Sequence, residues 1–124
     1  MTGYSVEIKE ASVELSAKQR IALKDTTSAL KLDEVTKSNP IIIYPQMWAV
    51  LGIHNEKSDN VDYENYILVD RDGTKYVTGS RSFWTSFMDI YNEMVNEDEE
   101  WGVKVFRVES KNYKGKEFIT CSIE

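Results

Sequence analysis

Residues 63–78 read YENYILVDRDGTKYVT, and this stretch carries the clearest structural signal in the chain. Its two halves are rich in Tyr, Ile, Leu and Val, which are typical of β-strands. Asp72 and Gly73 stand between the halves, and Asp-Gly between two such runs strongly favours a tight β-hairpin. The sequence therefore predicts two antiparallel strands, over residues 63–69 and 75–78.

The spacing of apolar residues predicts a strand before this hairpin and a helix after it. Residues 46–53 carry apolar side chains on both faces, which indicates a buried strand. Ser80 or Ser82 can cap a helix. One face of that helix is formed by four apolar residues at spacings of four, three and four: Phe83, Phe87, Ile90 and Met94. We expect this face to turn toward the core.

A second hairpin is expected at the C-terminal end. Residues 101–108 and 118–123 are rich in strand formers and are separated by a turn-like segment. The element order is then strand, long loop, hairpin, helix, hairpin. This is the order of the OB-fold, a five-stranded Greek-key barrel with a helix between its third and fourth strands. A generic α+β sheet would give the same order, so both are open, and either makes the chain mainly β.

The first forty residues have a different pattern. Val6 and Ile8, and then Val13 and Leu15, alternate with charged or polar residues, which suggests a strand or hairpin. Residues 17–25 can form a short helix capped by Ser16. We therefore divide the chain into an extension, residues 1–40, packed on an OB-fold-like domain, residues 41–124.

Composition argues against most enzymes. The 124 residues fit one domain, and apolar runs such as residues 41–44 are far below the roughly 20 residues of a membrane span. The N-terminus does not resemble a secretory signal, so we expect a cytoplasmic protein. Cys121 and His54 are the only residues of their types, too few for a disulfide or a zinc site. We expect no enzyme activity, cofactor or metal, although a carboxylate-based enzyme is not excluded.

The net charge of −6 is unevenly distributed. Residues 89–100 hold six acidic and no basic side chains, whereas residues 101–124 hold five basic and three acidic ones. A ligand responds to the field of the nearest face, so the acidic total does not exclude nucleic acid. The end of the acidic segment, here named the acidic block, consists of Glu97, Asp98, Glu99 and Glu100.

The expected nucleic-acid site combines rings, which stack on bases, with cations, which neutralise phosphates. An OB-fold binds on the face of its second and third strands and on the adjacent loops. Tyr113 lies between lysines in a turn and is the best candidate for an exposed ring, whereas Trp48, Tyr66 and Tyr76 would equally well fill the core. The candidate residues are Trp48, Tyr66, Lys75, Tyr76, Lys104, Arg107, Lys111, Tyr113, Lys114 and Lys116.

The segment NYILVDRDGTKYVTGS at residues 65–80, the helix that contains Phe83, and residues 111–123 together resemble small single-stranded-DNA-binding proteins encoded by phages of Gram-positive bacteria. The resemblance covers roughly residues 47–123. It implies an OB-fold that coats single-stranded DNA during phage or mobile-element replication in the host cytoplasm, with the candidate aromatic and basic residues on the strand. The extension at residues 1–40 and the internal position of the acidic block depart from the family pattern.

Two functions therefore follow from the sequence. The first is non-enzymatic binding of single-stranded DNA by stacking and phosphate neutralisation. The alternative is a protein-binding module, or a phage-encoded inhibitor, whose acidic block mimics nucleic acid toward a replication or host DNA-processing protein. The first needs the basic segment around residues 111–116 to dominate the functional face, and the second needs the acidic block to do so.

Overall fold

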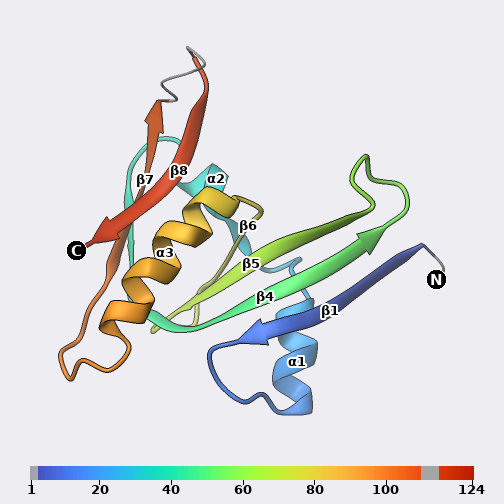
Figure 1. Cartoon of the computed structure of the whole chain (residues 1–124), viewed down its shortest axis with the longest axis horizontal. Coiled ribbons are helices and arrows are strands. Elements are labelled where there is room, and N and C mark those ends of the chain that lie inside the picture. Colours follow the sequence, from blue (N-terminus) through green and yellow to red (C-terminus); the bar gives the residue numbers. More distant parts are fainter. Residues whose placement is uncertain (1–2, 110–114) are drawn as a thin grey trace.

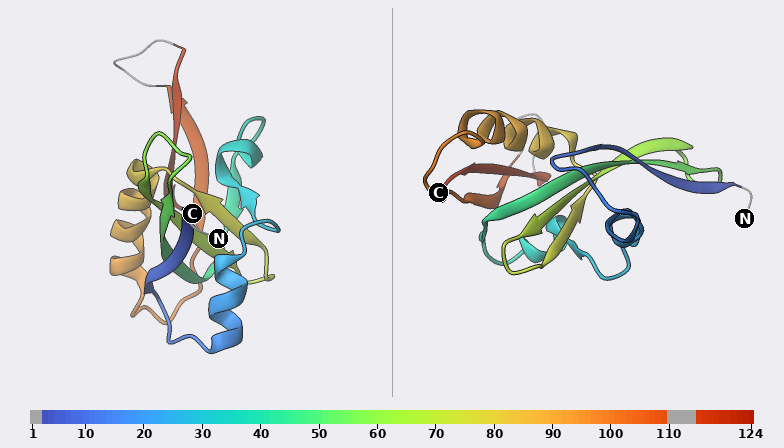
Figure 2. Two further views of the ribbon diagram at one scale, coloured as in Figure 1. Left: turned by 90° about the vertical axis from the view of Figure 1, so that its right-hand side faces the viewer. Right: turned by 90° about the horizontal axis from the view of Figure 1, so that it is seen from below.

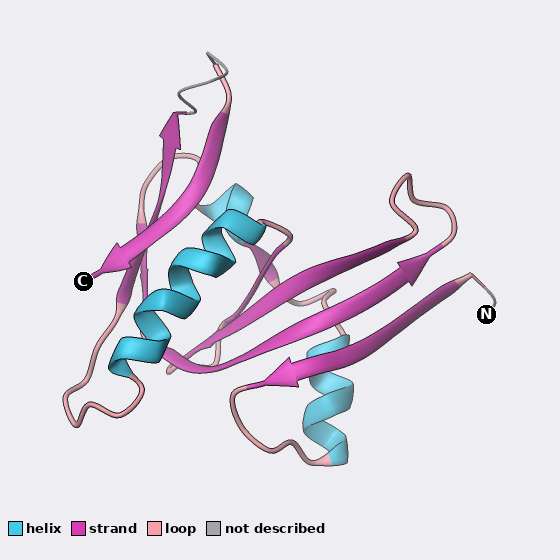
Figure 3. Cartoon of the chain, in the orientation of Figure 1, coloured by secondary structure: helices cyan, strands magenta, loops and turns pink. Residues whose placement is uncertain are grey.

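A computed structural model describes residues 3–109 and 115–124 (Figure 1). The described chain is mainly β, with eight strands in two sheets and three helices (Figure 3). Its elements in order are β1 (Tyr4–Ala11), α1 (Ala17–Lys24), β2 (Leu30–Lys31), α2 (Leu32–Val35), β3 (Ile41–Ile43), β4 (Pro45–Asn55), β5 (Asp62–Asp70), β6 (Lys75–Thr78), α3 (Arg81–Met94), β7 (Val103–Glu109) and β8 (Glu117–Ile123).

The first predicted hairpin is confirmed as β5 and β6, which pair antiparallel from Tyr66 opposite Thr78 to Val69 opposite Lys75. Its turn is closed by a hydrogen bond from the Asp70 amide to the Thr74 carbonyl, at 2.8 Å. Gly73 has a φ of 91°. Glycine adopts such a backbone conformation without steric cost. Gly73 is therefore the residue that makes the Asp-Gly pair suitable for this turn.

The larger sheet has five strands in the order β1-β4-β5-β6-β2, and the smaller has three in the order β3-β7-β8. The predicted C-terminal hairpin is thus confirmed as β7 and β8. β3 and β4 are separated only by Tyr44, so the chain passes directly from one sheet into the other. The Tyr44 amide donates to the Asp70 carboxylate at 3.2 Å, which fixes this crossing to the end of β5.

The strands do not form a closed barrel in the described part of the chain. An OB-fold would close between the third and fifth strands of the predicted domain, which are β6 and β8. Here the free side of β6 pairs in parallel with β2, from Leu30 opposite Tyr76 to Lys31 opposite Val77. The predicted five-stranded barrel is therefore not confirmed, because a short strand from the first forty residues occupies the edge that closure would use.

The predicted helix is confirmed as α3, which begins after Ser80. The Ser80 hydroxyl accepts a hydrogen bond from the Phe83 amide at 3.2 Å. Phe83 and Phe87 are completely buried in a core that joins α3 to both sheets, and Ile90 packs against it. The expected apolar face therefore does turn inward, although Met94, near the helix end, is only half-buried.

The first forty residues are built into the larger sheet. β1 pairs antiparallel with β4 along most of its length. α1 begins at Ser16, which forms the predicted cap together with Gln19, and it lies on the side of the larger sheet opposite α3 (Figure 2). Leu23 of α1 packs in a second core on that side. Val13 and Leu15 lie outside any strand. The alternation of apolar residues that predicted a strand or hairpin therefore extends beyond the end of β1.

Candidate nucleic-acid interface

Each face of the larger sheet is covered over part of its length. On one face, Trp48 and Tyr66 belong to the first core with α3, and on the other, Leu51 and Ile67 belong to the second core with α1. The strand face on which an OB-fold binds its ligand is therefore not open along β5 and β6. The predicted binding face has to be corrected.

Trp48 and Tyr66 are each about 5% exposed, so neither offers a ring face to a base. The Tyr66 ring stacks on the Trp84 ring, with centroids 4.8 Å apart and planes 12° apart. The Trp48 and Trp84 rings pack in a T-shaped arrangement, with centroids 5.6 Å apart and planes 76° apart. Both residues stabilise the core, which is the alternative role that the sequence allowed for them. Tyr76 is half-buried against the same core, and burial raises the pKa of its phenol.

Lys75 holds α1 in place instead of projecting into solvent. Its ammonium donates hydrogen bonds to the backbone carbonyls of Ala22, at 2.6 Å, and Asp25, at 2.7 Å. These are carbonyls at the C-terminal end of α1, where a cation is favourable because the helix leaves carbonyl groups unpaired there. The predicted phosphate contact of Lys75 is thus replaced by a structural role.

Arg107 also has structural partners. Its guanidinium donates to the backbone carbonyl of Asp33 in α2 and lies 3.8 Å from the Glu117 carboxylate. Arg107 therefore links β7 to α2, and its charge is partly neutralised. Of the basic residues predicted on β6 and β7, Lys104 is the one that is exposed.

The outward side of the smaller sheet brings Lys104 together with aromatic residues. Strand register places Ile42, Lys104 and Ser122 side by side, then Phe106 beside Thr120, then Val108 beside Phe118. The alternate residues of β7 and β8, such as Val105 and Cys121, point into the first core. We name this side the outer face, and it consists of Ile42, Lys104, Phe106, Val108, Phe118, Thr120 and Ser122.

The outer face combines exposed apolar surface with positive charge. Ile42 is 44% and Phe118 is 42% exposed, while Phe106 and Val108 are partly exposed and belong to neither core. None of its seven residues is acidic. The hairpin of β7 and β8 extends beyond the rest of the molecule (Figure 1). An exposed ring and a cation on the same face can together stack a base and attract a phosphate.

The predicted basic turn continues from this hairpin. Lys116 is described and exposed next to the start of β8. Lys111, Tyr113 and Lys114 lie outside the described residues, so their predicted contacts stay predictions.

The acidic block follows the C-terminal end of α3 (Figure 1). Glu97, Asp98, Glu99 and Glu100 are all exposed. Glu100 forms an ion pair with Arg71, whose guanidinium lies 3.8 Å from the centre of the Tyr44 ring. One carboxylate of the block therefore fastens the loop to the turn between β5 and β6.

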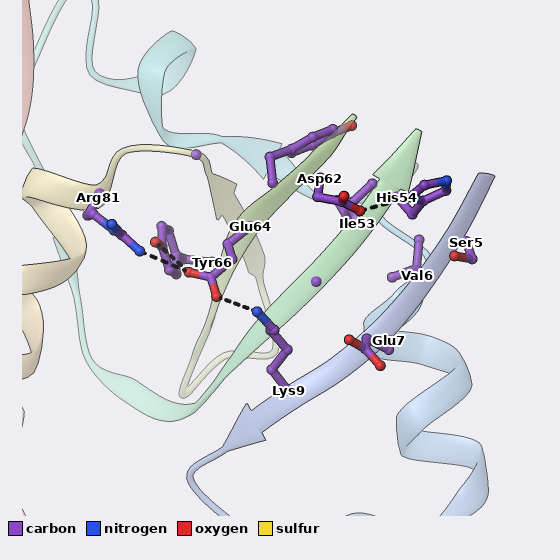
Figure 4. Close-up of a pocket in the computed structure, with 13 residues that line it drawn as sticks. Ser5, Val6, Glu7, Lys9, Ile53, His54, Asp62, Glu64, Tyr66 and Arg81 are labelled. Carbon is purple, nitrogen blue, oxygen red and sulfur yellow. Dashed lines mark hydrogen bonds and ion pairs between the residues drawn. The ribbon is translucent and has the colours of Figure 1, made fainter. Parts of the chain in front are cut away.

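A groove of about 880 Å³ runs along β1, β4 and β5 to the start of α3 (Figure 4). Glu64 is at its centre and accepts hydrogen bonds from the Lys9 ammonium at 3.0 Å and from the Tyr66 hydroxyl at 3.2 Å. The Arg81 guanidinium lies 3.7 Å away. The Lys9 hydrogen bond is the largest cause of the lowered pKa of Glu64. The charged side chains of the groove are largely paired with one another. We therefore expect the groove to attract phosphates only weakly.

Sequence reasoning missed the outer face and this groove. The signal for the groove was the charge alternation of Glu7 and Lys9 on one strand and of Asp62 and Glu64 on another. The signal for the outer face was the spacing of Lys104, Phe106 and Val108 by two. Neither signal says which strands become neighbours.

A scan against protein-family models, a search of curated proteins and a search of solved structures each found no match to this chain. Within residues 3–109 and 115–124, no group of three or more His, Cys, Asp or Glu residues is placed to hold a metal ion. No helix of that part is long and apolar enough to cross a membrane.

Proposed function

We propose that this protein binds single-stranded DNA, without catalysing a reaction, across the outer face of the smaller sheet. The observation that carries the proposal is the exposed Phe118 ring on a face that also holds Lys104 and has no carboxylate. An exposed ring can stack on any base, and a base–aromatic contact contributes about 1–3 kcal/mol of binding. A cation on the same face neutralises phosphate, so the two contacts favour the same ligand.

The dimensions of the face suit a short stretch of an extended strand. Residues two apart on a β-strand lie about 6.6 Å apart, so Lys104, Phe106 and Val108 form three successive rows along β7. Phe118 stands beside Val108 in the row nearest the hairpin connection. The proposal also retains, as further contacts, the sequence candidates that follow β7 in the chain: Lys111, Tyr113, Lys114 and Lys116.

The OB-like organisation belongs to the proposal as well. The order of elements from β4 to β8 and the direct passage from β3 into β4 support it, while the closing pair between β6 and β8 is replaced by β2. By the resemblance of residues 47–123 to phage single-stranded-DNA-binding proteins, the proposed setting is phage or mobile-element replication in the host cytoplasm.

Fluorescence anisotropy with labelled oligo-dT tests the proposal. Phe118→Ala should weaken binding about five- to 150-fold, which corresponds to about 1–3 kcal/mol. Ile21→Ala is the matched control, because Ile21 is 70% exposed on α1, away from the outer face. This control should bind like the parent. Equal affinities of all three proteins would refute the outer face as the site.

Salt dependence tests the phosphate contacts. Each contact with a single strand contributes about −0.7 to the slope of log affinity against log salt, so three or four lysines predict a slope of roughly −2 to −3. Tyr113→Ala tests whether Tyr113 contributes to binding in addition to the outer face. A loss of affinity in this variant with an unchanged melting temperature supports stacking of Tyr113 on a base.

The inhibitor hypothesis is the second candidate, favoured by the exposure of Glu97, Asp98 and Glu99. It predicts that the parent does not bind oligo-dT at any salt concentration. It also predicts that reversing these three charges abolishes capture of a basic DNA-processing protein. Binding of oligo-dT that survives the same charge reversal would favour the DNA-binding proposal.

A further inference from the structure

β1 forms one edge of the larger sheet, and within the described residues it pairs on one side only, with β4. In Figure 1 its N-terminal half runs outward without an element on its free side, whereas α1 lies near its C-terminal end. An edge strand of this length presents a row of unpaired backbone N–H and C=O groups to a further strand. The free edge is therefore a candidate interaction surface.

Residues 4–8 are the regular part of this edge. A β-bulge interrupts the pairing of β1 with β4 between Ile8 and Glu10. A bulge increases the local twist and interrupts regular pairing, so we expect an added strand to pair with residues 4–8 only. Tyr4, Val6 and Ile8 share one side of the regular part, and Ser5 and Glu7 share the other.

The apolar side of this edge is incompletely covered. Val6 and Ile8 pack against the second core, and both are partly exposed. Tyr4 is 46% exposed. An added strand that carries apolar residues on the same side would continue the second core beyond β1.

The sequence of this edge is symmetric in character about Val6, which identifies its partner. Residues 4–8 read apolar, polar, apolar, polar, apolar. We propose that two copies of the chain pair antiparallel through β1, with the two-fold axis at Val6. Val6 then faces the partner's Val6, Tyr4 faces the partner's Ile8, and Ser5 faces the partner's Glu7. Such an interface is self-complementary and closes as a dimer.

Other registers are less favourable. A shift of one residue places Tyr4 opposite the partner's Glu7 and puts the apolar sides of the two sheets on opposite faces. A shift of the axis to Ile8 centres the pairing on the bulge. The register about Val6 uses only regular strand, and it pairs an aromatic with a β-branched side chain twice, a favourable cross-strand combination.

Sedimentation of the full chain over a concentration series reaching hundreds of micromolar tests the dimer. The parent should approach twice the 14.3 kDa of one chain. Val6→Lys and Val6→Glu should each lose the dimer, because the axis places like charges opposite each other. A mixture of the two should regain it, because one pair then joins Lys to Glu. Val13→Lys is the control, since Val13 is 47% exposed beyond β1, and it should behave like the parent.

Cross-linking tests the register with a substitution that preserves packing. Val6→Cys faces itself across the axis and should form an intermolecular disulfide under mild oxidation, whereas Ser5→Cys faces Glu7 and should form about tenfold less. The native Cys121 is buried, which keeps it from competing. A parent that is monomeric throughout the series overturns the proposal. Cross-linking of Ser5→Cys that equals or exceeds that of Val6→Cys also overturns it.

Discussion

The variant Lys75→Met tests whether Lys75 stabilises the fold or contacts DNA. The variant keeps most of the aliphatic stem and removes the ammonium. In the structure this ammonium bonds the carbonyls of Ala22 and Asp25 at the end of α1. We expect Lys75→Met to lower the free energy of unfolding and to leave the affinity for oligo-dT unchanged.

The magnitude follows from these two hydrogen bonds. A hydrogen bond that involves a charged group contributes about 1.5–3 kcal/mol, but the carbonyls at the end of an exposed helix can bond water once the ammonium is removed. The lower end of that range, about 1.5 kcal/mol, is therefore the expected loss. For a chain of this length it corresponds to a fall in melting temperature of about 4–8 °C.

Circular dichroism melting, urea titration and oligo-dT anisotropy measure both effects. Lys104→Met is the matched comparison, because Lys104 is exposed on the outer face. It should show the reverse pattern, with parental melting and weakened binding. The reasoning is refuted if Lys75→Met melts like the parent, or if its affinity falls more than that of Lys104→Met.

Three further predictions concern the core and the groove. Phe87→Ala should lower the free energy of unfolding measured in urea by about 3–5 kcal/mol, because Phe87 is completely buried and its removal leaves a cavity. The Lys9 hydrogen bond holds the pKa of Glu64 below its ordinary value of 4.5, so this carboxylate stabilises the fold above that pH and the stabilisation is lost as pH falls through the lower folded pKa. Melting temperatures measured below pH 4.5 should therefore decline less steeply for Glu64→Gln than for the parent. Burial raises the pKa of the Cys121 thiol to about 12, so iodoacetamide at neutral pH should leave the native protein unmodified and label it fully in urea.

Local signals predicted the elements well because each depends on neighbouring residues. Gly73 supplies the positive φ that the β5–β6 turn requires, and Ser80 supplies the cap of α3. The spacing of Phe83 and Phe87 fixes the buried side of that helix. These features need no knowledge of distant residues, so the sequence alone determines them.

The covering of the strands could not be predicted in this way. Alternation placed Tyr66 and Ile67 on opposite sides of β5, but it did not show that α3 covers one side and α1 the other. The partners of Lys75 on α1 are about fifty residues away in sequence. Whether a side chain is exposed depends on which element packs above it. The candidate site therefore moved from β5 and β6 to the outer face of the smaller sheet.

The proposed dimer and the proposed DNA site are compatible because they use opposite ends of the molecule. The N-terminal half of β1 lies at one end of the long axis, and the smaller sheet lies at the other (Figures 1 and 2). A two-fold axis at Val6 therefore leaves both outer faces uncovered and places them far apart. Two separated faces bind a long strand together only if the strand spans them, and the second contact then gains from effective concentration. Short oligonucleotides consequently report on one face, so failure of the dimer would leave their affinity unchanged, and failure of the DNA site would leave the dimer intact.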